Sequence, residues 1–190
     1  MPQINDKIFN AFPILESERL LFRNFKKSDA LVFFQIRSNE EVMKYMDTYI
    51  HEKLEDAEEY IAGGQRAFEN KTMLNWAIIE QSSGEMIGYF GFWRLDRKNC
   101  RGEIGYALLP AFQRKGYMRE AMRTLIAFSF DELNLHSIEA NVNPENEASM
   151  QLLEQFGFKK EAYFRENYLY QNRFIDSVIY CLVKGDMFGE

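Results

Sequence analysis

Residues 103–122 read EIGYALLPAFQRKGYMREAM, and this stretch carries most of the information about the fold. An apolar, strand-like run ends at Pro110, a short basic loop follows, and a helix is expected from Gly116. The first N–H groups of a helix have no partner inside the helix, and the helix dipole adds partial positive charge there. Such a helix start, with a glycine that allows close approach, suits a phosphate group. The alternative is an ordinary turn in which Arg114 and Lys115 are solvated.

Two common phosphate-binding motifs are absent from the sequence. It contains no G-x-x-x-x-G-K-S/T pattern, which excludes a P-loop, and no G-x-G-x-x-G pattern, which excludes a dinucleotide fingerprint.

The 190-residue chain has a net charge of -6. This acidic balance disfavours nonspecific nucleic-acid binding through bulk charge, so we expect no nucleic-acid partner.

The rare residue types argue against a metal site or a disulfide framework. Cys100 and Cys181 are far apart, as are His51 and His136, and none has a spacing typical of metal ligands. We therefore expect no metal and a reducing, cytoplasmic location. The N-terminal stretch lacks the basic-then-apolar pattern of a signal peptide, and no apolar run approaches a membrane span, so we expect no membrane association.

The hydrophobic pattern predicts one domain that begins with a strand and continues with helices and a three-strand antiparallel meander. A helix, a strand, a second helix and a hairpin follow. The expected strands are 19–25, 73–81, 86–95, 100–109, 136–142, 158–170 and 175–183. The expected helices are about 28–36, 40–46, 54–68, 116–133 and 146–156, the last followed by a left-handed Gly157. This order predicts an α+β domain around a mixed sheet.

The basic loop and its surroundings match a known family. Gln113-Arg114-Lys115-Gly116-Tyr117-Met118 resembles the Q/R-x-x-G-x-G/A signature of the GNAT acetyltransferases, and it follows a strand as that family requires. Residues 142–162, VNPENEASMQLLEQFGFKKEA, resemble the second family signature, a strand followed by N-x-x-S/A-x-x-L-x-x-x-G-F. The resemblance covers residues 14–184, which implies an acetyltransferase domain over that range, an N-terminal arm at 1–13 and a C-terminal tail at 185–190.

Three further features resemble the branch of ribosomal-protein alanine or serine N-terminal acetyltransferases. They are the opening ESERLLFRNF at 16–25, the Tyr117-Met118 pair after the loop glycine, and the closing FRENYLYQNRFIDSVIYCLV at 164–183. Met118 stands where the general signature has Gly or Ala. A Met side chain can point into the core while its N–H faces the ligand, and a Met is familiar at this position in the branch.

The resemblance implies a single-domain GNAT-like fold. Its central sheet would be mixed and mostly antiparallel, with a splayed cleft and flanking helices, and acetyl-CoA would be the acetyl donor. The residues that would bind acetyl-CoA are Tyr106, Ala107 and Leu108 through their backbone, the loop and helix start Gln113, Arg114, Lys115, Gly116, Tyr117, Met118 and Arg119, and the later Asn141, Asn146 and Ser149. Asn146 is equally suited to cap the helix that follows it.

Acetyl transfer to an amine needs a polarised carbonyl, a neutral amine, a proton for the leaving thiolate and good alignment. Many relatives carry a Tyr seven residues after the Asn, but Leu153 stands there, so Ser149 is the candidate that protonates the thiolate. Its alternative role is a local capping hydroxyl. Glu103 is the preferred general base and Glu139 the second candidate. Either can instead be an ordinary surface carboxylate, with water removing the proton.

These features predict an acetyl-CoA-dependent N-acetyltransferase that acts on a primary amine. The branch favours the α-amine of a protein or peptide N-terminus. A small amine (a polyamine, an amino acid or an aminoglycoside) and a non-enzymatic acyl-CoA sensor are the alternatives. Trp93, Tyr168 and Tyr170 are expected near the acceptor, or as ordinary aromatic packing. A homodimer is a further partner arrangement that the sequence leaves open.

Overall fold

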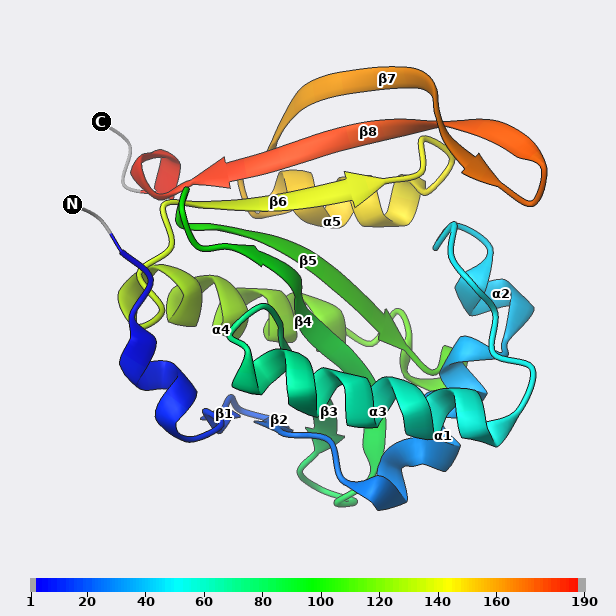
Figure 1. The fold of residues 1–190 in the computed structure, drawn as a ribbon, viewed down its shortest axis with the longest axis vertical. Helices are drawn as coiled ribbons and strands as arrows, with labels where there is room; N and C mark the ends of the chain where they lie inside the picture. Colours follow the sequence, from blue (N-terminus) through cyan, green and yellow to red (C-terminus); the bar gives the residue numbers. More distant parts are fainter. Residues whose placement is uncertain (1–2, 188–190) are drawn as a thin grey trace.

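One mixed sheet organises the chain, with strands in the order β1-β2-β3-β4-β5-β6-β8-β7 (Figure 1). The computed structural model describes residues 3–187. Its strands are β1 (Leu15–Glu16), β2 (Leu20–Arg23), β3 (Leu74–Glu80), β4 (Met86–Asp96), β5 (Arg101–Leu108), β6 (Ser137–Val142), β7 (Lys159–Tyr170) and β8 (Arg173–Val183). Over the described residues β5 and β6 pair in parallel, and the other neighbours pair antiparallel. The predicted α+β fold with a mixed, mostly antiparallel sheet is confirmed.

Helices cover both faces of this sheet (Figure 1). The helices are α1 (Ala30–Arg37), α2 (Glu40–Met43), α3 (Leu54–Glu69), α4 (Tyr117–Asp131) and α5 (Glu147–Gln155), and short 3-10 helices lie at Asp6–Asn10, Lys27–Asp29, Pro110–Phe112 and Lys184–Met187. Successive strand residues point to opposite faces. Accordingly, Trp76 and Ile78 of β3 pack in the core beneath α4 and α5, whereas Ala77 and Ile79 pack beneath α1 and α3. Each fully buried large side chain contributes about 1.5–3 kcal/mol.

Residues 3–13, which belong to the predicted N-terminal arm, pack against the rest of the described chain. Ile4 is 5% exposed and belongs to the core beneath α4. The Asn5 N–H donates to the Leu133 carbonyl at 3.0 Å, and the Trp76 indole N–H donates to the Pro13 carbonyl at 2.7 Å. Residues 3–13 therefore form part of the core beneath α4.

The element boundaries differ from the expected ones where the backbone leaves the regular conformation. The strand expected from residue 100 begins at Arg101, because Cys100 has a left-handed φ of 50° in the preceding turn. The helix expected to reach residue 46 ends at Met43 and closes with a turn in which Met46 N–H donates to the Met43 carbonyl. Gly157 has the left-handed φ of 81° predicted after α5. No helix in residues 3–187 is long and apolar enough to cross a bilayer.

A fork between β5 and β6 is the feature that positions the site. The two strands pair at Arg101↔Ser137, Gly102↔Ile138 and Glu103↔Glu139, and the strand pairing ends after Glu103 and Glu139. Beyond this point they diverge (Figure 1). The edge of β5 from residue 104 to 108 therefore faces an opening with backbone groups free for a ligand or water. The predicted splayed cleft is confirmed.

Candidate active site

The loop that enters α4 presents a row of free backbone N–H groups. Within residues 3–187, the N–H groups of residues 114–119 donate to no backbone or side-chain acceptor. Arg114 and Gly116 have left-handed φ values of 58° and 81°, so the chain turns sharply into the helix. Consecutive free N–H groups at a helix start form an anion-binding concavity, to which the helix dipole adds positive potential. This geometry favours the phosphate-binding interpretation over an ordinary solvated turn.

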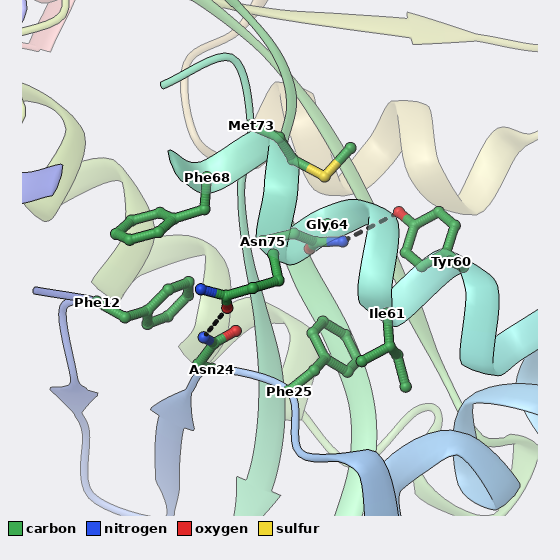
Figure 2. A pocket seen from close by; sticks show the side chains of 10 residues that line it. Phe12, Asn24, Phe25, Tyr60, Ile61, Gly64, Phe68, Met73 and Asn75 are labelled. Carbon is green, nitrogen blue, oxygen red and sulfur yellow. Dashed lines mark hydrogen bonds between the residues drawn. The ribbon is translucent and has the colours of Figure 1, made fainter. Parts of the chain in front are cut away.

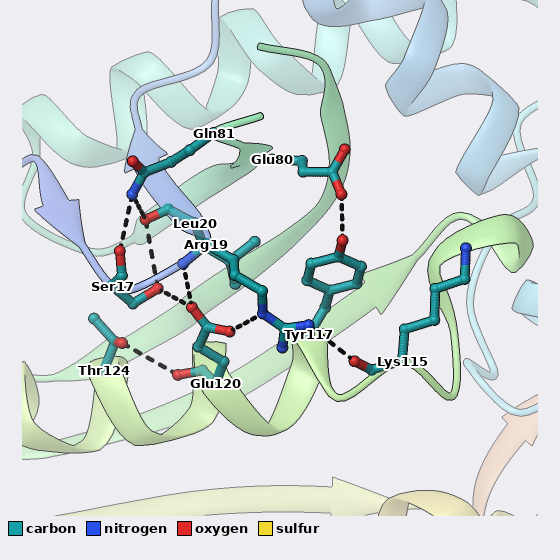
Figure 3. Close-up of polar contacts among 9 residues, drawn as sticks. All are labelled: Ser17, Arg19, Leu20, Glu80, Gln81, Lys115, Tyr117, Glu120 and Thr124. Atoms are coloured by element: carbon teal, nitrogen blue, oxygen red, sulfur yellow. Dashed lines mark hydrogen bonds and ion pairs between the residues drawn. The ribbon is translucent and has the colours of Figure 1, made fainter. Parts of the chain in front are cut away.

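The loop is held in place by the N-terminal strand region, through a network that the sequence analysis missed (Figure 3). The Glu120 carboxylate in the first turn of α4 accepts from the Ser17 hydroxyl at 2.7 Å and from the Arg19 N–H and Nε, each at 2.7 Å. Arg19 Nη1 donates to the Lys115 carbonyl at 3.1 Å, and its guanidinium lies 4.4 Å from the centre of the Tyr117 ring. Burial by itself would raise the pKa of Glu120, but these hydrogen bonds hold it below its ordinary value.

The Tyr117 hydroxyl also donates to Glu80 at the end of β3 (Figure 3). The loop is thus fixed from the neighbouring strands. The only signal for this network in the sequence was the ESER part of the opening motif, whose contact with the loop spans about a hundred residues along the chain.

The predicted side chains of the loop are largely engaged by the protein itself. Gln113 donates to the Leu108 carbonyl at 3.2 Å, and Arg119 donates to Gln155 of α5 at 2.6 Å. Met118 packs against the core beneath α4. The arrangement leaves the backbone of the loop, together with the exposed Arg114 and Lys115, to meet an anion.

A cleft of about 560 Å³ opens at the fork. This volume lies within the usual range for a small-ligand site. Of the predicted site residues, the cleft brings together Glu103, Tyr106, Glu139, Asn141, Asn146 and Ser149. Ala107 and Leu108 are buried in β5, and residues 113–119 lie outside the cleft. The predicted site residues therefore divide into a loop whose free N–H groups face outward and a cleft lined by titratable side chains.

The cleft passes through the sheet from one face to the other. Tyr106 packs with the core beneath α4 and α5 and meets Ser149 of α5, so both lie on that face. Alternation along β5 and β6 places Glu103 and Glu139 on the opposite face, the one on which Ala107 packs with α1 and α3. Two reactants entering from opposite faces would therefore meet at the fork.

Tyr106 and Ser149 form a hydroxyl pair at the fork. Their oxygens are 2.8 Å apart, and either can be the donor. Burial raises the pKa of Tyr106 to about 12, so its phenol keeps its proton at neutral pH. Asn146 Oδ1 accepts from the Ser149 N–H at 3.1 Å and caps α5, so the capping alternative is realised while Asn146 still lines the cleft. The sequence analysis gave Tyr106 only a backbone role, and the structure adds its hydroxyl.

Glu103 and Glu139 are the last paired residues before the fork opens. Arg94 Nη2 lies 2.6 Å from Glu103 and 3.4 Å from Glu139, and Arg101 also pairs with Glu139. Burial raises the pKa of Glu103, Arg94 opposes the shift, and the net pKa lies above the ordinary value. Of the two carboxylates, Glu103 is the more buried, at 6% exposed, and its raised pKa favours acceptance of a proton.

A β-bulge helps to build this charged cluster. The register of β4 against β5 shifts between Phe92 and Arg94, so Trp93 is an extra residue. The shift sets Arg94 directly opposite Glu103. Trp93 itself lines the cleft and is 48% exposed. Because a bulge has no periodic signal, the sequence analysis did not find Arg94.

The far side of the cleft is closed by segments that are distant in the sequence. Asn143 Nδ2 donates to both Asp47 oxygens, at 3.2 and 2.9 Å. The Tyr170 hydroxyl donates to the Thr48 carbonyl at 3.0 Å, tying the β7–β8 hairpin to the loop after α2. Of the expected aromatics, Trp93 and Tyr168 line the cleft, whereas Tyr170 supports the rim. Asp47 is a further lining residue that the sequence analysis missed.

A second, much smaller hollow lies between α3 and the first strands (Figure 2). Its volume of about 10 Å³ admits no more than about one water molecule. Tyr60, Met73 and Asn75 line both this hollow and the cleft, and Asn75 donates to the Tyr60 hydroxyl at 3.2 Å. These three side chains therefore form a wall between the hollow and the cleft. No group of three potential metal ligands comes together in the described part of the chain.

Residues 19–159 match the model of the acetyltransferase (GNAT) domain family. The chain is 37% identical over 174 residues to the uncharacterized N-acetyltransferase YoaA of Bacillus subtilis (strain 168), covering 91% of this chain and 98% of that protein. It is 30% identical over 112 residues to the ribosomal protein uS5-alanine N-acetyltransferase of Escherichia coli (strain K12), covering 58% of each.

The fold is also similar to a solved structure, that of spermidine N-acetyltransferase from Vibrio cholerae in complex with CoA and spermine. The TM-score is 0.80 at 20% identity, over 91% of this chain and all of that one. At this identity the likeness shows the fold alone.

Proposed function

The chain belongs to the GNAT acetyltransferase family, and on that premise we propose that it transfers the acetyl group of acetyl-CoA to the α-amine of a peptide or protein N-terminus. The single observation that carries the proposal is the fork between β5 and β6. It opens beside the Tyr106–Ser149 pair on one face and the Glu103–Glu139 pair on the other. A donor and an acceptor can therefore approach the same point from opposite sides.

Acetyl-CoA would bind along the face beneath α4 and α5. The free N–H groups of residues 114–119 would hold its diphosphate, with the charges of Arg114 and Lys115 nearby. The unpaired edge of β5 would receive the pantetheine arm through backbone hydrogen bonds. Asn146 lines the cleft where this arm would end, and Asn141, whose side chain lies on the Glu139 face of β6, would meet the arm through its backbone.

The reaction needs no covalent enzyme intermediate. The amine nitrogen attacks the thioester carbonyl carbon, a C–N bond forms, and the C–S bond breaks. Glu103 accepts the proton that the amine loses, directly or through water. The departing sulfur takes a proton from the Ser149 hydroxyl, and Tyr106 passes its proton to Ser149. Water then returns a proton to Tyr106, whose pKa is raised to about 12, and takes the proton held by Glu103, so that both groups regain their starting states.

A peptide N-terminus is the favoured acceptor for two reasons. The relative that is 30% identical is named for an alanine of ribosomal protein uS5. The acceptor side of the cleft is broad and rimmed by half-exposed aromatic residues, Trp93 and Tyr168, which suit an extended chain. A small cationic amine is the second candidate, because the carboxylates of Asp47 and Asp176 also line the cleft. A cytoplasmic location belongs to the proposal, since Cys100 and Cys181 are both free.

The test is release of free CoA when acetyl-CoA is mixed with a panel of peptides and small amines. The panel contains peptides with a free N-terminus, the same peptides blocked by acetylation, and polyamines. We expect turnover with free peptide N-termini and none with blocked ones. Turnover with polyamines alone would show that the acceptor is a small amine and not a peptide N-terminus. Tight acetyl-CoA binding with no turnover on any amine would indicate a sensor.

A further inference from the structure

Arg37 is a buried cation in the wall of the cleft. It lies in the last turn of α1, is 8% exposed, and lines the same cleft as Glu103 and Ser149. Its Nη2 donates to the Tyr49 carbonyl at 3.0 Å and its Nη1 to the Tyr89 hydroxyl at 3.5 Å. Its Nε is buried and has no hydrogen-bond partner.

Within residues 3–187, no carboxylate lies within 4.0 Å of the Arg37 guanidinium. The other arginine of the cleft differs in this respect. Arg94 has a side chain that is 60% exposed, yet it pairs with both Glu103 and Glu139. The more exposed cation is thus neutralised while the buried one is not, so Arg37 has capacity for an anion.

A buried charge without a counter-ion is costly, and the local compensation is small. Position near the C-terminus of α1 favours a cation, but only weakly. Burying an unpaired charge costs much more than this, even after the surroundings relax. His51, which lies nearby, adds no negative charge, and burial followed by repulsion from Arg37 lowers its pKa, so it is neutral at pH 7.

The groups around Arg37 are arranged to donate. The Tyr60 hydroxyl accepts from Asn75 (Figure 2), which leaves its own proton free for a ligand. Burial raises the pKa of Tyr60 to about 12, so that proton is retained at neutral pH. Phe33 stacks on Tyr60 at 4.6 Å and tilts against Tyr89 at 5.1 Å, which fixes both hydroxyl-bearing rings. The wall is therefore rigid and offers a guanidinium with phenolic O–H groups.

We infer that Arg37, with the Tyr60 and Tyr89 hydroxyls, forms a subsite that binds a carboxylate of the acceptor. This inference rests on the proposed function, because it places the carboxylate in the cleft that receives the amine. The acceptor amine would face Glu103 and Glu139, and its carboxylate would face Arg37. The carboxylate can come from an acidic side chain close to the N-terminus of a peptide or from the α-carboxylate of a free amino acid.

Binding of matched pairs separates these sources and needs no turnover. Calorimetric titrations use the protein saturated with CoA. The first arm compares C-terminally amidated peptides that begin with Ala and carry Asp or Asn at the second, third or fourth position. The second arm compares alanine with alaninamide. In one of the two arms, we expect the compound that carries the carboxylate (the Asp peptide or alanine) to bind at least about 10-fold tighter than its neutral partner (the Asn peptide or alaninamide). This is a difference of about 1.4 kcal/mol in binding free energy.

The variants show whether Arg37 causes that preference. Arg37→Gln should remove the difference within the preferred pair, and Arg37→Lys should retain part of it, because a point charge replaces the guanidinium fork. Affinity for CoA should be unchanged in both. Arg165→Gln, an exposed arginine outside the cleft, is the matched control and should keep the preference. Thermal unfolding of each variant checks that it is folded.

Equal binding within every pair, or no binding of any member at millimolar concentration, would overturn the inference. A preference that persists in folded Arg37→Gln would also overturn it. The CoA-release assay judges the proposed function separately. Turnover of neutral and acidic acceptors at equal efficiency would support the acetyltransferase activity and reject the subsite. A carboxylate preference in binding without any turnover would support the subsite and reject the activity.

Discussion

The donor loop and the acceptor side of the cleft are built in different ways. The donor loop uses consecutive backbone N–H groups of residues 114–119, so its binding surface comes from one short stretch. The acceptor side uses side chains from α1, α3, the loop after α2, the strands β4, β5 and β6, and the β7–β8 hairpin. A backbone site tolerates many side chains provided that the loop keeps its shape. A side-chain site depends on which residues the fold brings together, so its specificity changes with single substitutions.

If the two regions act separately, variants should divide into three classes. Changes at the fork should lower kcat, changes around the donor loop should raise the KM for acetyl-CoA, and changes on the acceptor side should raise the KM for the amine.

The largest effect is expected at Glu103. Glu103→Gln keeps the shape of the side chain but removes the base, and kcat should fall by about 10³-fold. The KM for acetyl-CoA should be unchanged, because Glu103 lies on the face away from the donor. Glu139→Gln is the matched control, and its effect on kcat should be much smaller. Steady-state kinetics with both substrates varied measures these changes. A kcat close to that of the unmodified protein would remove Glu103 from the mechanism.

The same pair gives a pH test. Burial raises the pKa of Glu103, with Arg94 opposing the shift. The unmodified protein should therefore lose kcat as the pH falls through a value above that of an ordinary Glu, because the base becomes protonated. Glu103→Gln should lack this acidic limb. Identical pH profiles would assign the limb to another group.

The second effect is expected at the hydroxyl pair. Ser149→Ala and Tyr106→Phe should each lower kcat by about 10²-fold, through loss of proton delivery to the leaving sulfur. The Phe variant keeps the edge-on contact with Phe90 at 5.2 Å, so packing is preserved. Because the two hydroxyls act as a unit, the double variant should lose little more than either single one. Multiplicative losses would mean that they act independently.

A third, smaller effect is expected from the network that fixes the donor loop. Glu120→Gln weakens the charge-assisted bonds to Arg19 and Ser17, and the KM for acetyl-CoA should rise by about 10-fold. The kcat and the amine KM should be retained. Asp131→Asn, at the other end of α4, is the control. Because the pKa of Glu120 is lowered, the ionised network should persist from neutral pH into the acidic range and fail only below the ordinary pKa of a Glu. An unchanged KM would show that the loop keeps its shape without this network.

The smallest effect is expected at the acceptor rim. Trp93→Ala should raise the KM for the amine by about 5-fold, as expected for loss of one aromatic contact. The KM for acetyl-CoA should stay the same. Phe164→Ala is a matched control, because Phe164 is also 48% exposed but lies outside the cleft. If the acetyl-CoA KM rises instead, the division into donor and acceptor regions is wrong at this residue.

Much of the fold was predictable from local patterns. The order of the seven expected strands and five expected helices, the left-handed Gly157 and the basic loop at the start of α4 all follow from periodicity and turn chemistry over a few residues. The two-residue strand β1 was not predicted. The errors fall where the backbone departs from regular geometry, as at Cys100, whose left-handed φ delays the start of β5. The roles of the loop and the catalytic residues stay predictions until the variants are measured.

The sequence by itself determined most of the helices and strands and the row of N–H groups at Gly116, because each depends on residues that are neighbours in the chain. The tertiary structure decided which side chains share the cleft. A bulge at Trp93 sets Arg94 against Glu103, and packing of α1 under the sheet buries Arg37 without a counter-ion. Such contacts join residues tens of positions apart. Their energies depend on burial and on the charges nearby, which the spacing of residues along the chain does not encode.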